Sequence, residues 1–436
     1  MPASTKNKST KNNIMGKLND IRFTKTNGGM GRTGAGEDLI SGLVFGGFGA
    51  DVLTFGTASG NLKGFDTISE NASPVAHIRK FQSPKQLADA GIVWTENGSG
   101  SGTDGALNAT EKAKNALYYH ISEFFRISEE GTLYVMIKPG ATQIAAADLT
   151  KLQNYADGAI RQCGVFDLNS THITVAALQT ELTNLETNHM PMSVVLTYNG
   201  APSGTAVTIS SLTGTSLATD GKCNVSVLIG CDGDATLAGN LDTYAHYGCI
   251  GACIGAISKA SVHESIAWVQ KFPLGLKAPA LFNGQLIKNV SISDQETLND
   301  NRYIFVRTHV GVADNYFNDS HTCDLLTSDY AYIENVRTID KACRGVRSKL
   351  LPYLNSPLSV DASTGKLSAD TVALLETVAG EALEDMEKAG ELSGFRAEID
   401  PDQNVLATSE VEVVIKNVPK GVMRKVNVKI GFATQV

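Results

Sequence analysis

The sequence predicts a mixed α/β protein with more than one domain. Between residues 40 and 260, short apolar runs typical of buried strands alternate with segments of helical periodicity, which favours an α/β layer with some parallel pairing. After residue 300 the pattern changes to two long helical segments and three alternating runs. A chain of 436 residues is long enough for two or three domains with a sizeable core.

The predicted strands of the first region are short runs rich in β-branched and aromatic residues. They are LVFGG at 43–47, TLYVMIK at 132–138, MSVVLTY at 192–198 and NVSVLIG at 224–230. The predicted helices cover residues 108–127, 148–162 and 174–187. In the first helix Leu117, Ile121 and Phe124 recur at helical spacing, so that helix should bury one face.

The last third predicts two long helices packed on a β-sheet. The elements are a strand at 303–310, helices over 330–351 and 367–390, and strands at 394–401, 409–418 and 425–436. Pro352 should stop the first helix because proline cannot continue it. Ser368 is suited to cap the second helix and Gly390 to end it.

Charge is distributed unevenly along the chain. The formal net charge of −8 argues against bulk binding to nucleic acid. Residues 1–25 carry six basic residues against one acidic residue, and residues 413–436 carry five basic residues and no acidic one. The body between them is therefore acidic. Either this pattern is incidental, or each end docks on an acidic body, its own or a neighbour's.

Composition excludes several classes of protein. Seven scattered cysteines, several within apolar stretches, predict buried thiols in a reducing compartment and no disulfide framework. The N-terminus, MPASTKNKSTKNN, lacks the apolar core of a secretory signal. No run reaches the ~20 apolar residues that a membrane helix needs. The sequence thus predicts no membrane insertion.

Glycines at 28–36 allow two interpretations. Gly29, Gly31 and Gly34 fit the pattern G-x-G-x-x-G of dinucleotide-binding loops. Such a loop needs a hydrophobic strand before it and a helix after it, whereas here the preceding KLNDIRFTKTN is polar and the following EDLISGLVFGG resembles a strand. The favoured interpretation is a hinge between the N-terminal segment and the body.

Two groups of residues invite a test for metal binding or catalysis. Four potential ligands fall on one face of a predicted helix: Asp242, His246, Cys249 and Cys253. They span about three turns, too far for one tetrahedral zinc shell, so a close-packing face with Gly248, Gly251 and Gly255 is favoured. His321 and Cys323 share a face in NDSHTCD, but nothing nearby orients them as a catalytic pair. We predict no catalytic, metal or cofactor residue.

The two long helices of the last third carry opposite charge. The first has a basic stripe made of Arg337, Lys341, Arg344 and Arg347. The second carries Glu376, Glu381, Glu384, Asp385 and Glu387. These are either solvated faces, or an ion-pair seam between the helices, or a docking face for a charged partner.

Long stretches of the chain resemble the contractile tail sheath proteins of phages and related injection machines. They are YIENVRTIDKACRGVRSKLLPYLNSPLSVDASTGKLS at 332–368, GELSGFRAEIDPDQNVLATSEVEVVIKNVPKGVMRKVNVKIGF at 390–432 and GGMGRTGAGEDLISGLVF at 28–45. The chain is most similar to the sheath-like family of Bacteroidetes-type phages. Thr338 departs from that pattern, because a second Arg is common there.

The resemblance implies stacked hexameric rings around an inner tail tube, with baseplate and tail terminator proteins as further partners. It also implies that an N-terminal and a C-terminal arm each add a strand to a sheet of an adjacent subunit. The expected arm strands contain Leu18, Ile21, Phe23, Val426, Val428, Ile430 and Phe432, of which the last four alternate with polar or small residues. The expected hinges are Gly28, Gly29, Gly31, Gly34, Gly36, Pro419 and Gly421. As tube-facing residues we choose Arg337, Lys341, Arg344 and Arg347.

The sequence as a whole predicts a structural, non-enzymatic sheath subunit without a cofactor. The expected parts are a disordered tail (1–15), an arm strand with its hinge (16–37), an outer α/β region (38–290), an inner core (291–420) and a C-terminal arm strand (421–436). The particle would be a phage virion tail, assembled in the host bacterial cytoplasm, or an injection system. Two alternatives remain: a dinucleotide-binding enzyme and a capsid-type shell protein.

Overall fold

The computed structural model describes residues 36–49, 52–70, 73–140, 143–168, 173–198, 208–245 and 248–433. These belong to one compact unit that begins at Ala35. The expected N-terminal arm strand, with Leu18, Ile21 and Phe23, lies outside the described residues. So do the predicted hinge glycines Gly28, Gly29, Gly31 and Gly34.

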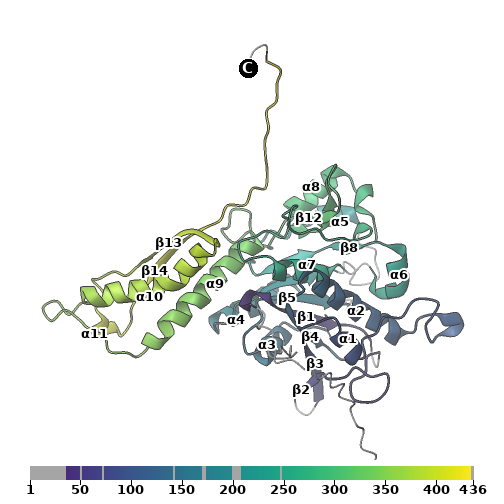
Figure 1. Cartoon of the computed structure of the whole chain (residues 1–436), viewed down its shortest axis with the longest axis horizontal. Coiled ribbons are helices and arrows are strands. Elements are labelled where there is room, and N and C mark those ends of the chain that lie inside the picture. The colour runs from purple at the N-terminus through teal and green to yellow at the C-terminus, as the bar shows by residue number, and fades with distance from the viewer. Residues whose placement is uncertain are drawn as a thin grey trace, which may run out of the picture. The chain divides into compact units, whose positions relative to one another are not determined.

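An eight-stranded sheet forms the centre of the larger part of the chain (Figure 1). Its order is β10-β7-β6-β5-β1-β4-β3-β2. The strands from β10 to β4 run parallel to one another, β3 pairs antiparallel with β4, and β2 pairs antiparallel with β3. The strands are β1 (Ile40–Gly46), β2 (Asp66–Glu70), β3 (Ser73–Phe81), β4 (Thr132–Ile137), β5 (Gln162–Asp167), β6 (Ser193–Thr197), β7 (Val225–Leu228) and β10 (Tyr303–Ile304). Central strands are buried on both faces, as expected for a parallel sheet between helical layers.

Helices cover the two faces of this sheet. Leu43 and Phe45 of β1 pack with helices α2 (Ala109–Ile127) and α7 (Ile250–Lys259) in one core cluster. Val44, which points to the opposite face, packs with α3 (Ala147–Tyr155) and α4 (Val175–Thr187) in a second cluster. The alternation of side chains along β1 thus builds both cores.

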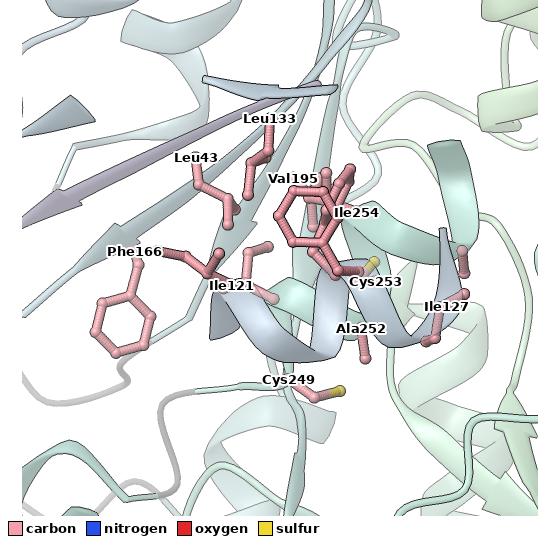
Figure 2. Packing of buried hydrophobic residues seen from close by; sticks show 14 of the residues in the cluster. Leu43, Ile121, Ile127, Leu133, Phe166, Val195, Cys249, Ala252, Cys253 and Ile254 are labelled. Carbon is pink, nitrogen blue, oxygen red and sulfur yellow. The ribbon is translucent and has the colours of Figure 1, made fainter. Parts of the chain in front are cut away.

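Helices α2 and α7 lie unusually close together because α7 carries glycines at their contact. A Cβ added to Gly251 would lie 1.9 Å from the carbonyl oxygen of His120, and one added to Gly255 would lie 2.9 Å from that of Phe124. Figure 2 shows the apolar residues that gather between these helices and the sheet, among them Ile254. The predicted close-packing role of these glycines is confirmed.

The C-terminal part combines α9 (Ile333–Leu350) and α10 (Ala369–Lys388) with the hairpin β13 (Leu392–Glu398) and β14 (Val414–Pro419) (Figure 1). The shared core contains Ala342 of α9, Leu383 and Met386 of α10, and Leu392 of β13. This confirms the prediction of two long helices packed on a β-sheet.

The ends of α10 follow the predicted chemistry. The Ser368 hydroxyl accepts the backbone N–H of Thr371 at 3.3 Å and so caps the helix. Gly390 has a φ of +78°, a conformation that favours glycine after a helix. Both local signals are therefore read correctly from the sequence.

Short elements complete the described chain. They are η1 (Glu37–Leu39), α1 (Gln86–Asp89), η2 (Thr103–Gly105), α5 (Ile209–Thr213), β8 (Gly230–Asp232), α6 (Ala235–Leu241), η3 (Asp242–Tyr244), β9 (Pro279–Leu281), η4 (Ile287–Asn289), α8 (Ile292–Asp300), β11 (Val306–Thr308), β12 (Asn315–Phe317), η5 (Leu351–Tyr353) and α11 (Val405–Thr408). β8 pairs with β9, and β11 with β12, as separate antiparallel pairs.

Three predictions of local structure are wrong. The helix over 148–162 ends at Tyr155, because Asp157 and Gly158 have a positive φ and turn the chain before β5 begins at Gln162. The strand at 303–310 splits into β10 and β11, which join different sheets. The helix proposed to align Asp242 with Cys253 is instead the turn η3 followed by α7, so the two residues share no helix.

Candidate functional site: the bases of the two terminal segments on helix α9

Helix α9 joins the C-terminal part to the rest of the described chain through its polar residues. Its apolar residues Ile333, Val336 and Ala342 are buried. Arg337, Lys341 and Arg344 recur at spacings of four and three, so they share one face of the helix, as predicted. What that face contacts depends on the tertiary fold.

Two acidic residues just before β1, Glu37 and Asp38, bind this basic face, and we call them the N-terminal anchor. The Asp38 carboxylate lies 2.7 Å from Lys341 Nζ and 3.2 Å from Arg344 Nη2. Glu37 Oε1 lies 2.9 Å from Arg344 Nε and also pairs with Arg161. Burial alone would raise the pKa of Asp38, but the hydrogen bond and charge of Lys341, with the arginines of α9, lower it. The anchor is therefore an ionised cluster.

Arg337 lies deeper than the rest of the basic face. Its side chain is 4% exposed, and Nη1 donates to the carbonyl oxygen of Ala260 at 3.1 Å. Burial lowers the pKa of Arg337 to about 10, which still leaves it charged at neutral pH. Lys341 also pairs with Glu391, at 2.7 Å, and so ties the start of β13 to the same cluster.

Within the described subunit, three residues of the predicted tube-facing stripe contact their own chain. Arg337 is buried and donates to the carbonyl oxygen of Ala260, whereas Lys341 and Arg344 bind the N-terminal anchor. Arg347 is exposed, so contact with a tube stays a prediction for that residue. The alternative was a row of ion pairs between α9 and α10. Among the described residues, Lys349 of α9 and Glu381 of α10 form such a pair at 2.9 Å.

At the other end of the chain, the Arg424 side chain reaches the N-terminal end of α9. Its Nε lies 3.0 Å from Asp319 Oδ2, and its Nη2 pairs with Glu334, the second residue of the helix. The guanidinium also lies over the Tyr332 ring, 3.4 Å from the centroid, in a cation–π contact. We call these four residues the C-terminal anchor. It lies after the predicted hinge at Pro419 and Gly421, and among the described residues Arg424 is the last whose side chain makes an ion pair.

Glu334 makes the C-terminal anchor sensitive to the loss of Arg424. Its side chain is 2% exposed, and the Ser320 hydroxyl donates to Oε2 at 2.5 Å. Burial raises the pKa of Glu334, an effect that the charge of Arg424 opposes. Without Arg424 a buried carboxylate would lack its cation, which is strongly unfavourable.

After Arg424 the chain continues as an extended trace (Figure 1). We call residues 425–433 the terminal segment. Its alternating apolar residues are exposed: Val426 63%, Val428 70%, Ile430 91% and Phe432 112%. Within the described residues it is assigned to no strand, so its predicted pairing with a neighbour stays a prediction.

The hairpin β13–β14 is a sheet with open edges. The sheet contains these two strands, as far as the described residues extend. Phe395 and Ile415 pack toward the helices, whereas Val414 and Val418 on β14 are 44% and 56% exposed. A two-stranded sheet is marginal by itself and presents unpaired N–H and C=O groups at its edges.

The remaining chemical candidates gain no support. His321 Nε2 pairs with Asn299 at 3.0 Å, and Cys323 is fully buried, where burial raises the pKa of its thiol to about 12. No group of three or more His, Cys, Asp or Glu that could hold a metal occurs among the described residues, which exclude His246. In the same part of the chain no helix has the length and apolar character needed to span a bilayer. The glycines of the dinucleotide alternative lie outside it.

Sequence reasoning missed both anchors. From the sequence, Glu37 ends the part that holds the hinge (16–37), Asp38 begins the outer region (38–290), and Arg424 counts only toward the basic charge of the C-terminus. The available signal was an acidic pair directly before the first buried strand, opposite in sign to the stripe on α9. Opposite charge indicates that the acidic pair and the basic stripe attract each other, but it does not indicate that the fold brings them into contact.

Solved structures with the same fold come from contractile particles. A chain of the anti-feeding prophage (AFP) baseplate is 12% identical with a TM-score of 0.57, covering 96% of this chain and 100% of that one. A chain of the contracted AFP helical sheath is 14% identical with a TM-score of 0.55, covering 96% and 99%. A chain of the contracted sheath complex of PVC, an extracellular contractile injection system, is 12% identical with a TM-score of 0.56, covering 99% of both. The chain therefore has the fold of sheath proteins of contractile injection systems, as the sequence resemblance implied.

The chain belongs to the DUF2586 family. The N-terminal domain of that family matches residues 18–321, and its C-terminal domain matches residues 329–436. No curated protein matches the sequence. Residue 290, the expected division between outer region and inner core, lies within the first match, and β10 beyond it still pairs with β7 of the eight-stranded sheet.

Proposed function

We propose that this protein is a structural, non-enzymatic subunit of a contractile tail sheath. Copies of the chain assemble as stacked hexameric rings around an inner tail tube, between a baseplate and a terminator, in a phage tail or an injection-system particle. Contraction is then a change between two packings of the same subunits. The likeness of fold over 96–99% of the chain supports this class of function.

The observation that carries the proposal is the exposed terminal segment. A soluble monomer gains nothing from four large apolar residues that alternate on an extended chain and contact no core. The same pattern is what strand addition requires, since backbone hydrogen bonds supply strength and alternate side chains supply register. The proposed occupant of the neighbouring sheet is therefore residues 425–433 of a second copy.

The proposed acceptor is the hairpin β13–β14. Its open edges offer backbone partners, and strand addition would convert a marginal two-stranded sheet into a larger one. Arms that enter neighbours in this way would link subunits while their bodies move. The proposed tube contact on the inner side includes Arg347, the exposed member of the basic stripe.

Negative-stain microscopy of the purified full chain tests the proposal, with a chain that ends after Lys425 as the comparison. The shortened chain keeps Arg424 and so keeps the C-terminal anchor. We expect striated hollow tubes from the full chain and folded, unassembled subunits from the shortened one. Icosahedral shells would support a capsid-type protein instead, and tubes from both chains would refute the role of the segment.

A further inference from the structure

Both anchors lie on the same helix. The C-terminal anchor uses Glu334 in the first turn of α9, and the N-terminal anchor uses Lys341 and Arg344 farther along it. Glu334 and Lys341 are separated by about 10 Å of helix axis, from the rise of 1.5 Å per residue. One continuous helix therefore joins the two anchors.

The C-terminal anchor holds one residue of an otherwise exposed stretch. Met423 is 80% exposed and Val426 is 63% exposed, whereas the Arg424 side chain between them is 25% exposed. Arg424 makes two ion pairs and a cation–π contact with residues from two parts of the chain. Such multiple, partly buried contacts are stronger than an isolated surface ion pair.

The consequence of this anchor is geometric. Without it the nearest fixed residue is Pro419, the last residue of β14. The five residues from 420 to 424 can span at most about 17 Å when extended, so the start of the terminal segment could range over a volume of that radius. A flexible tether of this kind lowers the effective concentration of the segment at a neighbour's sheet.

We propose that Arg424, with Asp319, Glu334 and Tyr332, is a positioning clamp that sets where the terminal segment leaves the body, and that α9 is the strut connecting this clamp to the N-terminal anchor. Helix α9 then offers a direct mechanical path between the two anchors, in addition to the path through β1, which follows the N-terminal anchor in the chain. The role in force transmission rests on the proposed function. The clamp itself is a property of the single subunit and is measured there.

Limited trypsin digestion of the full-length subunit tests the clamp, with Glu334→Gln as the variant. This change removes the charge paired with Arg424 and leaves every cleavage site in place. Cleavage after Lys420 and Arg424 should become about tenfold faster, because the local opening that exposes these bonds loses one charged partner. Cleavage after Lys429, beyond the clamp, should be unchanged and serves as the internal standard.

Two further variants keep the test independent of global unfolding. Asp319→Asn removes the other, more accessible acid and should raise the cleavage rate after Lys420 by a smaller factor. Glu387→Gln on the exposed face of α10 makes the same chemical change as Glu334→Gln and should leave all rates unchanged. Thermal melting of each variant verifies that it is folded. Equal cleavage rates in folded Glu334→Gln and wild-type protein would overturn the clamp.

Assembly of the same proteins separates this inference from the proposed function. If the wild type forms tubes, Glu334→Gln should reduce their yield at least tenfold. The separate variant Arg424→Lys, which keeps the positive charge, should retain a larger part of the wild-type yield. If cleavage responds as expected but the wild type forms no tubes, the clamp stands and the sheath function fails. Tubes of equal yield in wild type and Glu334→Gln would overturn the role of the clamp in assembly.

Discussion

Replacing Ile430 with aspartate separates the stability of the subunit from the stability of its assembly. Ile430 is 91% exposed and belongs to the alternating face of the terminal segment. The substitution removes no packing within the subunit, so its free energy of unfolding should change by less than about 0.5 kcal/mol. The same residue is expected to be buried in a neighbour's sheet.

The expected effect on assembly follows from that burial. Covering an isoleucine side chain is worth about 1.5–3 kcal/mol. An aspartate in its place loses this term and adds a desolvation cost of about 1–3 kcal/mol or more. A total loss of about 4 kcal/mol for each interface corresponds to roughly a thousandfold weaker contact.

The assay is the critical concentration for tube formation, measured by sedimentation and light scattering. Ile430→Asp should raise it beyond the accessible protein concentration. Asn427→Asp makes the same change in charge on the opposite face of the segment and should raise it by less than tenfold. An equal rise in both variants would refute the register of the strand, and no rise in either would refute strand exchange through this segment.

Three other predictions concern the subunit itself. Gly251→Ala should lower the free energy of unfolding by about 3 kcal/mol, because the new Cβ would lie 1.9 Å from the His120 carbonyl oxygen; urea denaturation measures this. Burial raises the pKa of Asp340 to about 7, so the folded state retains a proton that the unfolded chain loses near pH 4. Stability should therefore fall as pH rises from about 4 to about 7, by up to about 1.4 kcal/mol per pH unit, and Asp340→Asn should flatten that slope in thermal melts. Arg344→Gln should cost about 1–3 kcal/mol in urea denaturation, because Asp38 loses a charged hydrogen-bond donor.

Each of the three predictions on subunit stability has a matched control variant or a result that would contradict it. Gly36→Ala should have no effect on unfolding, since an added Cβ meets no atom closer than 3.9 Å there. Arg347→Gln removes an exposed arginine of the same helix as Arg344 and should change stability by less than about 0.5 kcal/mol. A pH profile of Asp340→Asn that matches the wild type would contradict the buried, protonated carboxyl.

Local chemistry was predictable where neighbouring residues determine the structure. The Ser368 cap, the glycine at 390 and the strands β1, β4, β6 and β7 follow from short-range sterics, hydrogen bonds and alternation. The error over residues 148–162 has the opposite origin. The apolar periodicity continues past Tyr155, but the chain turns at Asp157 and Gly158, which both have a positive φ, and it enters the central strand β5 at Gln162.

The sequence by itself determined the class of fold, the periodicity of its helices and strands, and the alternation of apolar and polar residues in the terminal segment. It also determined that Arg337, Lys341 and Arg344 share one face of a helix, because helical spacing is a local property. Only the tertiary structure decided that this face binds Glu37 and Asp38, more than 290 residues earlier in the chain. The sequence shows which residues are charged but not which of them pair, because an ion pair forms only where the packing of the whole chain brings two charged groups together.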